Sequence, residues 1–190
     1  MSRQTKKNYV TPEEYLAYER AAEYKNEYFD GEIVAMTGAS RKHNLIAGNV
    51  FTALKNQLRG KPCEVYMSDM RVRIKAANLY TYPDVAAACG TPEFEDAQVD
   101  TLLNPLLIIE VLSKSTASYD RAQKFDYYRT LPSLEEYLLV EQDAYHVVQY
   151  VKQPDGRWLL ADIRGAEGRV ELASVGCVLS LADVYERVEM

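Results

Sequence analysis

The spacing of hydrophobic residues predicts two amphipathic helices in the first third of the chain. In residues 11–23 and 40–58, apolar positions recur every three or four residues, as on one face of a helix. Thr11, followed by Pro12 and by a glutamate three residues on, forms a capping box for the first helix. Ser40 is placed to cap the second helix.

A third helix is predicted from about Tyr119 to Leu131, where Pro132 ends it because proline cannot continue a helix. On this helix, every third or fourth position is expected to pack inward: Ala122, Phe125 and either Tyr128 or Arg129. Tyrosines at core-like spacing are likewise interpreted as packing residues: Tyr15, Tyr18, Tyr128 and Tyr137.

The remaining hydrophobic segments have the pattern of strands. Asp30-Gly31 between two short apolar runs predicts a two-residue hairpin turn. Residues 90–104 are expected to form an acidic loop. Further strands are predicted at Cys63–Ile74, Tyr82–Ala88, Leu106–Leu112, Glu136–Glu141, Tyr145–Val151 and Arg157–Ile163. This order of elements predicts a single α/β or α+β domain over residues 1–190, with one mixed central sheet flanked by helices.

The predicted hairpin carries two acids on one face. Because strand side chains alternate, Glu27, Phe29, Glu32 and Val34 should all point to the same side. Two carboxylates on a half-apolar face suit a site, and the alternative is that both are cross-strand surface residues. The sequence does not distinguish Glu27 from Glu32.

The two histidines receive different interpretations. His43 lies in the first turn of the second helix, on or beside its buried face. One interpretation is that His43 contacts a phosphate or another ligand near the positive end of the helix. The alternative is that it is a hydrogen-bonded structural residue. His146 is expected on the surface of a strand.

The distribution of charge is more informative than the net charge of -6, which argues against a protein that coats DNA electrostatically. Residues 41–75 hold eight basic residues and two acids, whereas residues 84–110 hold six acids and no base. Such a sequence suits a site that holds both a phosphate chain and a cation. Two solvated faces are the alternative.

Three cysteines, Cys63, Cys89 and Cys177, lie far apart without metal-finger spacing, so we expect reduced thiols in a cytoplasmic protein. No apolar run reaches the roughly 18 residues of a membrane helix, and the N-terminus does not have the pattern of a signal peptide.

Two acids stand inside apolar strands. Asp84 begins one strand and Glu110 lies near the end of another. A buried charge is costly unless it is paired or bound to a metal. Two such acids on neighbouring strands predict a site for a hard cation such as Mg²⁺. The alternative is that each acid caps a helix or pairs with an arginine.

These acids lie in segments that resemble a known family. The chain is similar to the Uma family of restriction endonuclease-like proteins, within the PD-(D/E)xK nuclease-like superfamily. The similarity is carried by Tyr82-Pro83-Asp84-Val85, Leu107 to Ser113, Tyr119-Asp120-Arg121 with Lys124, and also by residues 27–36, 40–43, 131–137 and 179–188. The resemblance implies a restriction-endonuclease-like sheet flanked by helices, with Asp84 and Glu110 as ligands of Mg²⁺ or Mn²⁺. It also favours a site role for His43.

The superfamily pattern places a lysine two residues after the glutamate, where this chain has Leu112. Lys114 and Lys124 are the candidate replacements. Lys124 is favoured because the family repeatedly has lysine there, four residues after Asp120. The alternative is that Lys124 forms only a surface salt bridge with Asp120.

The activity implied is hydrolysis of DNA phosphodiester bonds by a metal-dependent endonuclease, in which Glu27 or Glu32 completes the metal site. The alternative is a catalytically silent relative that binds nucleic acid or a protein partner. A homodimer is expected because two cuts on a duplex need two sites. Candidate phosphate contacts are Arg41, Lys42, Arg71, Arg73 and Lys114, although for Arg71 and Arg73 a solvated strand edge is favoured.

Overall fold

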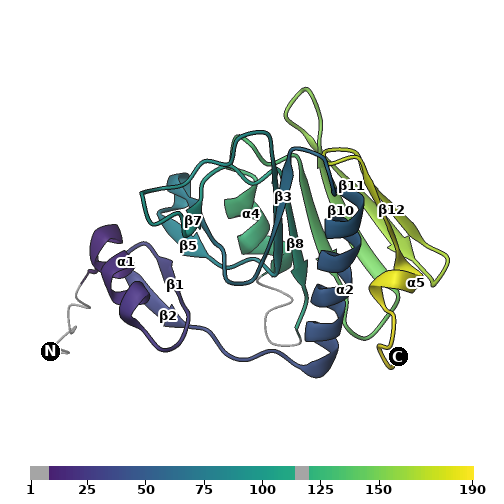
Figure 1. The fold of residues 1–190 in the computed structure, drawn as a ribbon, viewed down its shortest axis with the longest axis horizontal. Helices are drawn as coiled ribbons and strands as arrows, with labels where there is room; N and C mark the ends of the chain where they lie inside the picture. The colour runs from purple at the N-terminus through teal and green to yellow at the C-terminus, as the bar shows by residue number, and fades with distance from the viewer. Residues whose placement is uncertain (1–8, 114–119) are drawn as a thin grey trace, which may run out of the picture.

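The computed structural model describes residues 9–113 and 120–190, and it has two mixed sheets and several helices (Figure 1). Helix α1 (Pro12–Ala21) and a hairpin lie at one end of the molecule, against the first sheet. This five-stranded sheet has the order β2-β1-β5-β4-β7. Its strands are β1 (Asn26–Phe29), β2 (Glu32–Ala35), β4 (Arg71–Ile74), β5 (Leu79–Thr81) and β7 (Thr101–Leu102).

The predicted capping box and hairpin turn are both present. The Thr11 side chain accepts from the Glu14 N–H, and the Glu14 carboxylate accepts from the Thr11 N–H. Asp30 and Gly31 both have positive φ, as a tight turn between right-twisted strands requires. The register pairs Phe29 with Glu32, as predicted.

The second sheet has six strands in the order β11-β10-β9-β8-β6-β3, with β8 and β9 parallel and the other neighbours antiparallel. Its strands are β3 (Cys63–Met67), β6 (Val85–Cys89), β8 (Leu107–Val111), β9 (Glu136–Val140), β10 (His146–Lys152) and β11 (Trp158–Arg164). Together with the flanking helices, the two mixed sheets confirm the predicted fold class, although the strands divide between two sheets where one central sheet was predicted.

Alternation along β8 assigns one side of this sheet to each of two helical layers. Leu107, Ile109 and Val111 pack in the cluster that contains α2 (Arg41–Gln57). Ile108 packs in the opposite cluster, with Tyr128 of α4 (Phe125–Tyr128). A π-helical turn, η2 (Asp120–Lys124), leads directly into α4.

The C-terminal ribbon of β12 (Arg169–Leu172) and β13 (Cys177–Ser180) packs on the α2 side, followed by α5 (Leu181–Val184). A short 3₁₀ turn, η1 (Lys75–Ala77), joins β4 to β5. In the described ranges, no helix is both long and apolar enough to cross a membrane.

Two predicted strands and one predicted loop have different boundaries. Residues 63–74 are not one strand, because a turn at Met70, whose N–H donates to the Met67 carbonyl, separates β3 from β4. These two strands belong to different sheets. The strand predicted at residues 82–88 begins at Val85, and the acidic loop contains β7.

The cysteine prediction is wrong. Cys63 and Cys89 face each other across the β3–β6 pair and form a disulfide, whereas Cys177 is free and buried. A sequence separation of 26 residues conceals this pairing, because only the sheet register brings the two side chains together. Cysteine usage therefore no longer supports the expectation of reduced thiols.

Packing predictions at single residues have mixed outcomes. Tyr15, Tyr128 and Tyr137 are fully buried, as expected, but Tyr18 is 52% exposed because α1 buries a narrow stripe around Tyr15. His146 is buried, and its Nε2 lies 3.1 Å from an Asp162 oxygen, so the surface prediction is wrong.

Candidate functional site

The sheet register places Asp84 beside Glu110. Antiparallel pairing of β6 with β8 sets Val85 opposite Ile109, so the preceding and following residues, Asp84 and Glu110, are opposed. Asp84 is fixed there because its Oδ2 accepts the Val111 N–H at 2.8 Å. Two acids 26 positions apart in the sequence thereby reach one face of the sheet, which is the face covered by η2 and α4.

Glu110 is almost completely buried, at 4% exposure. Its Oε1 accepts a hydrogen bond from the Tyr128 hydroxyl at 2.8 Å and lies 2.9 Å from the Lys124 Nζ. Burial raises the pKa of Glu110 to about 8, and the carboxylates of Asp84 and Asp120 act in the same direction against Lys124.

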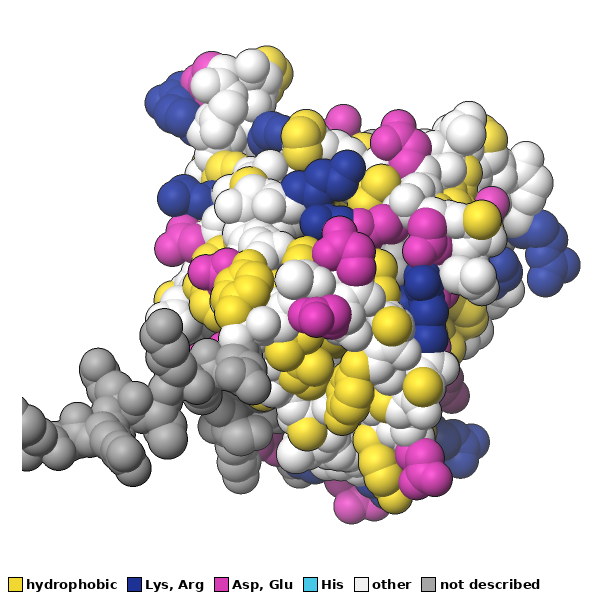
Figure 2. All heavy atoms as spheres, turned by 90° about the vertical axis from the view of Figure 1, so that its left-hand side faces the viewer, with side chains coloured by type: hydrophobic (Ala, Val, Ile, Leu, Met, Phe, Trp, Pro, Cys, Tyr) yellow, Lys and Arg dark blue, Asp and Glu magenta, His cyan; other side chains and the backbone are white. Residues whose placement is uncertain are grey.

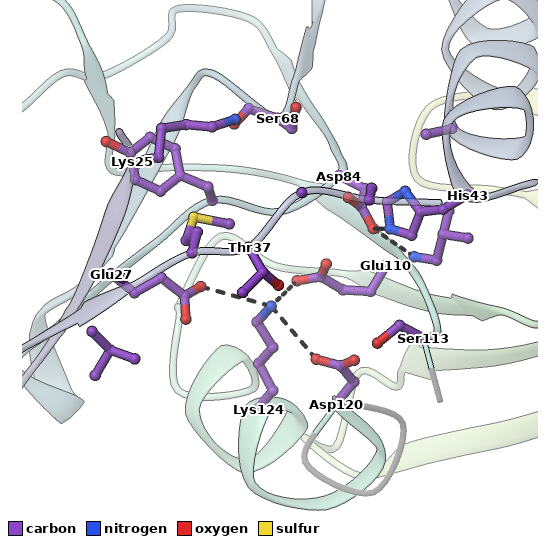
Figure 3. A pocket seen from close by; sticks show the side chains of 18 of the residues that line it. Lys25, Glu27, Thr37, His43, Ser68, Asp84, Glu110, Ser113, Asp120 and Lys124 are labelled. Carbon is purple, nitrogen blue, oxygen red and sulfur yellow. Dashed lines mark hydrogen bonds and ion pairs between the residues drawn. The ribbon is translucent and has the colours of Figure 1, made fainter. Parts of the chain in front are cut away.

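Lys124 extends from the π-helical turn into the middle of three carboxylates (Figure 3). Its Nζ lies 2.9 Å from Glu110, 3.6 Å from Asp120 and 3.9 Å from Glu27. Burial lowers the pKa of Lys124, but these carboxylates outweigh burial and hold it well above its ordinary value. The alternative of a surface salt bridge is wrong, because Lys124 and Asp120 are both buried.

His43 meets Asp84 from the start of α2. The Ser40 hydroxyl caps this helix by accepting the His43 N–H at 3.1 Å, which fixes the first turn. The His43 Nε2 then lies 3.1 Å from the Asp84 Oδ2. Burial lowers the pKa of His43, but the hydrogen bond and charge of Asp84 outweigh burial and raise it overall.

The structure separates the two acids of the hairpin. Glu27 lies toward the open end of the hairpin, lines the same cavity as Asp84, and accepts a hydrogen bond from the Thr81 hydroxyl. Glu32 is exposed next to the turn and does not line this cavity. Glu27 is therefore the hairpin acid that the fold brings to the others.

These side chains line a cavity of about 1000 Å³. Its walls come from the hairpin, the segment of residues 35–40, the start of α2, the ends of β6 and β8, and η2 with α4. In residues 9–113 and 120–190, no group of three or more histidine, cysteine or acidic side chains is arranged to hold a metal ion. Asp84 and Glu110 both line this cavity and offer two carboxylates as oxygen donors, with the Lys124 ammonium beside Glu110.

Two residues of this site are not predicted as functional by the sequence. The sequence indicates Asp120 only as a partner of Lys124, and Tyr128 only as a packing residue. Buried positions in this segment, Asp120, Lys124 and Tyr128, recur every four residues, and this spacing is the signal that could have identified them. Ala122, which was expected on the packing face, is exposed.

The predicted phosphate contacts do not reach the cavity. Arg71 is 4% exposed and is bound by Asp100, Thr101 and Tyr82. It is therefore neither a phosphate contact nor a residue of a solvated strand edge. Arg73 pairs with Glu95. The basic stretch and the acidic stretch therefore partly neutralise each other.

Two other predicted contacts lie at the start of α2 and outside the cavity lining. Arg41 lies 3.6 Å from Glu189, and Lys42 lies 2.9 Å from Asp143. Lys114 falls outside the described residues.

The fold matches a solved nuclease-like structure. The match is to a chain from Anabaena variabilis titled "a putative nuclease belonging to DUF820", with a TM-score of 0.76 over 93% of this chain and 97% of that chain. Sequence identity is 16%, so this likeness shows the fold alone.

The family follows from sequence comparison. The model of the Uma2 family, described as "Putative restriction endonuclease", matches residues 12–182, and the chain belongs to this family. Two similar proteins come from Synechocystis sp. and are uncharacterized. One, sll1609, is 40% identical over 86% of this chain and 93% of its own length. The other, slr1290, is 39% identical over 93% of this chain and 91% of its own length.

Proposed function

We propose that this protein is a metal-dependent endonuclease that hydrolyses phosphodiester bonds of DNA. The main support is that Asp84, Glu110 and Lys124 line one cavity. Asp84 directly precedes β6, Glu110 lies in β8, and Lys124 lies in the π-helical turn η2. Three residues so far apart in the sequence form the acid, acid and lysine combination that the superfamily resemblance implies. Family membership supports the same activity.

The donor set fits Mg²⁺ or Mn²⁺. Mg²⁺ takes oxygen ligands, keeps several waters, and is commonly held by only one or two protein carboxylates. Asp84 and Glu110 are the two residues that would hold it, since they are opposed on adjacent strands and line the cavity. When bound, the ion supplies a Lewis acid that lowers the pKa of water and neutralises charge on phosphate oxygens.

The other side chains position these groups. The Lys124 ammonium offers hydrogen-bond donors to an attacking water or to phosphate oxygens beside Glu110. Tyr128 orients the Glu110 carboxylate, and His43 orients that of Asp84. Glu27 lies on the opposite side of Lys124 from Asp120, where it limits how the ammonium can move (Figure 3).

The decisive experiment removes each proposed metal ligand in turn. With plasmid DNA and single-stranded DNA in Mg²⁺ or Mn²⁺, Asp84→Ala and Glu110→Ala are expected to lower the cleavage rate more than about 100-fold. This exceeds the roughly 10- to 100-fold loss typical for residues that only support a ligand. Calorimetry should show weaker metal binding in both variants.

Asp126→Ala is the matched control, because Asp126 is an exposed acid of α4 that pairs with Arg129 outside the cavity. It should cut at the wild-type rate. Cleavage that survives both ligand substitutions would contradict the proposed function.

A second prediction concerns His43. His43→Asn removes the imidazole that holds the Asp84 Oδ2, so metal affinity should fall by about 10- to 100-fold. Titration calorimetry with Mn²⁺ measures this change directly. Unchanged affinity would show that the Val111 N–H alone fixes Asp84.

A further inference from the structure

The charges of the cavity lining are poorly suited to a phosphate backbone. Among the described residues, it carries two lysines, Lys25 and Lys124, against five acids: Glu23, Glu27, Asp84, Glu110 and Asp120. Lys25 is already held by the Ser68 carbonyl and Asp69, each at 2.9 Å. Double-helical DNA presents mainly phosphates and sugars to a protein, and their contacts draw on arginine, lysine and free N–H groups.

The same wall offers large apolar and aromatic side chains instead. Phe29 is 39% exposed and Val34 is 51% exposed, and both line the cavity on the hairpin face that carries Glu27. The Phe29 ring lies against Tyr127 of α4, with 5.3 Å between the centroids. Figure 2, which looks onto the side bearing the hairpin, shows hydrophobic side chains gathered between acidic ones. Such exposed apolar area marks a binding surface.

The size of the cavity points the same way. Small-molecule cavities span roughly 300–1000 Å³, so this one is large for a ligand site. It does not enclose a double helix, so only the strand that reaches the two carboxylates can enter it. A short stretch of one strand is what this space and this wall admit.

We propose that the substrate is an unpaired DNA strand, whose bases stack on Phe29 and Tyr127 while one phosphate lies at Asp84 and Glu110. Base faces carry no charge, so the surrounding acids do not repel them, and aromatic stacking accepts any base. The phosphate requires a cation at the two carboxylates, because those acids would otherwise repel it. This inference rests on the proposed function for its phosphate half, whereas the stacking half is tested by binding alone.

The test compares binding of a fluorescein-labelled 20-nucleotide single strand with binding of the same sequence as a blunt duplex. Fluorescence anisotropy in Ca²⁺, which also takes oxygen ligands, reports affinity without reference to cleavage. The single strand is expected to bind at least tenfold more tightly. Phe29→Ala and Tyr127→Ala should each weaken single-strand binding by about 5- to 100-fold, as loss of one stacking ring does.

Tyr18→Ala is the matched control, since Tyr18 is an exposed aromatic outside the cavity lining. It should bind the single strand as wild type does, and Phe29→Trp should retain binding. Equal or tighter binding of the duplex, or unaltered binding by both ring variants, overturns the inference. Metal-dependent cleavage confined to duplex DNA overturns it while the proposed function stands. Stacking-dependent binding without cleavage supports the stacking half alone, and the proposed function and the phosphate half then fail together.

Discussion

Lys124→Met is expected to lower the rate of metal-dependent DNA cleavage by about 100- to 1000-fold, as loss of one fixed donor at a developing charge does. Methionine keeps a long apolar stem along the buried path but removes the ammonium that lies 2.9 Å from Glu110. Because Asp84 and Glu110 remain, the loss should appear in kcat more than in KM. Mn²⁺ binding measured by calorimetry should persist.

Two lysine variants sharpen this result. Lys152→Met removes an ammonium that donates to the Pro132 carbonyl, remote from the cavity lining, and should cut at the wild-type rate. Lys114→Ala tests the other lysine that the sequence offers, and it should keep most of the activity. Wild-type cleavage by Lys124→Met, with cleavage lost in Lys114→Ala, would reverse the assignment. Thermal unfolding of each variant separates loss of chemistry from loss of fold.

The two acids could be predicted from the sequence because their signal is local. Asp84 directly precedes the apolar strand β6 and Glu110 lies within the apolar strand β8, and a buried charge at such a position requires a partner whatever the fold. Lys124 carries no comparable local signal. Leu112, where the superfamily has its lysine, packs in the apolar cluster with Tyr128. Lys124 reaches Glu110 from the helical layer over that same face, a contact that depends on tertiary structure.

The third helix packs through Phe125 and Tyr128, as its apolar spacing predicts, but Ala122 is exposed. Here the buried positions Asp120 and Lys124 are charged, because they face the site rather than a core. π-helical turns occur frequently at functional sites, and this one brings Asp120 and Lys124 to the cavity.

Charge runs failed as predictors of the phosphate surface for a related reason. The basic stretch at residues 41–75 and the acidic stretch at residues 84–110 predict a shared site for phosphate and cation, yet the two stretches pair with each other where β4 lies beside β7 in one sheet. Arg71 meets Asp100 through this pairing, at 2.7 Å, and is buried by it. A run of like charges identifies a free surface only when its partners in space are known.

Tyr15→Ala is expected to destabilise the protein by about 3–5 kcal/mol, the cost of removing a buried aromatic ring from a packed core. Tyr15 is fully buried among Tyr28 and Tyr80, with centroids 5.1 Å and 5.0 Å away, and these rings attach α1 to the first sheet. Its hydroxyl donates to the Asn26 carbonyl at 2.6 Å. Urea unfolding followed by circular dichroism measures the change.

Graded variants separate packing from the hydrogen bond. Tyr15→Phe keeps the ring and leaves the buried Asn26 carbonyl without this donor, which costs about 1–3 kcal/mol. Tyr18→Ala, an exposed tyrosine on the same helix, should change stability by less than about 0.5 kcal/mol. Equal effects at Tyr15 and Tyr18 would contradict the packing assigned to α1. Since Asn26 directly precedes Glu27, loss of this anchor should also lower cleavage activity.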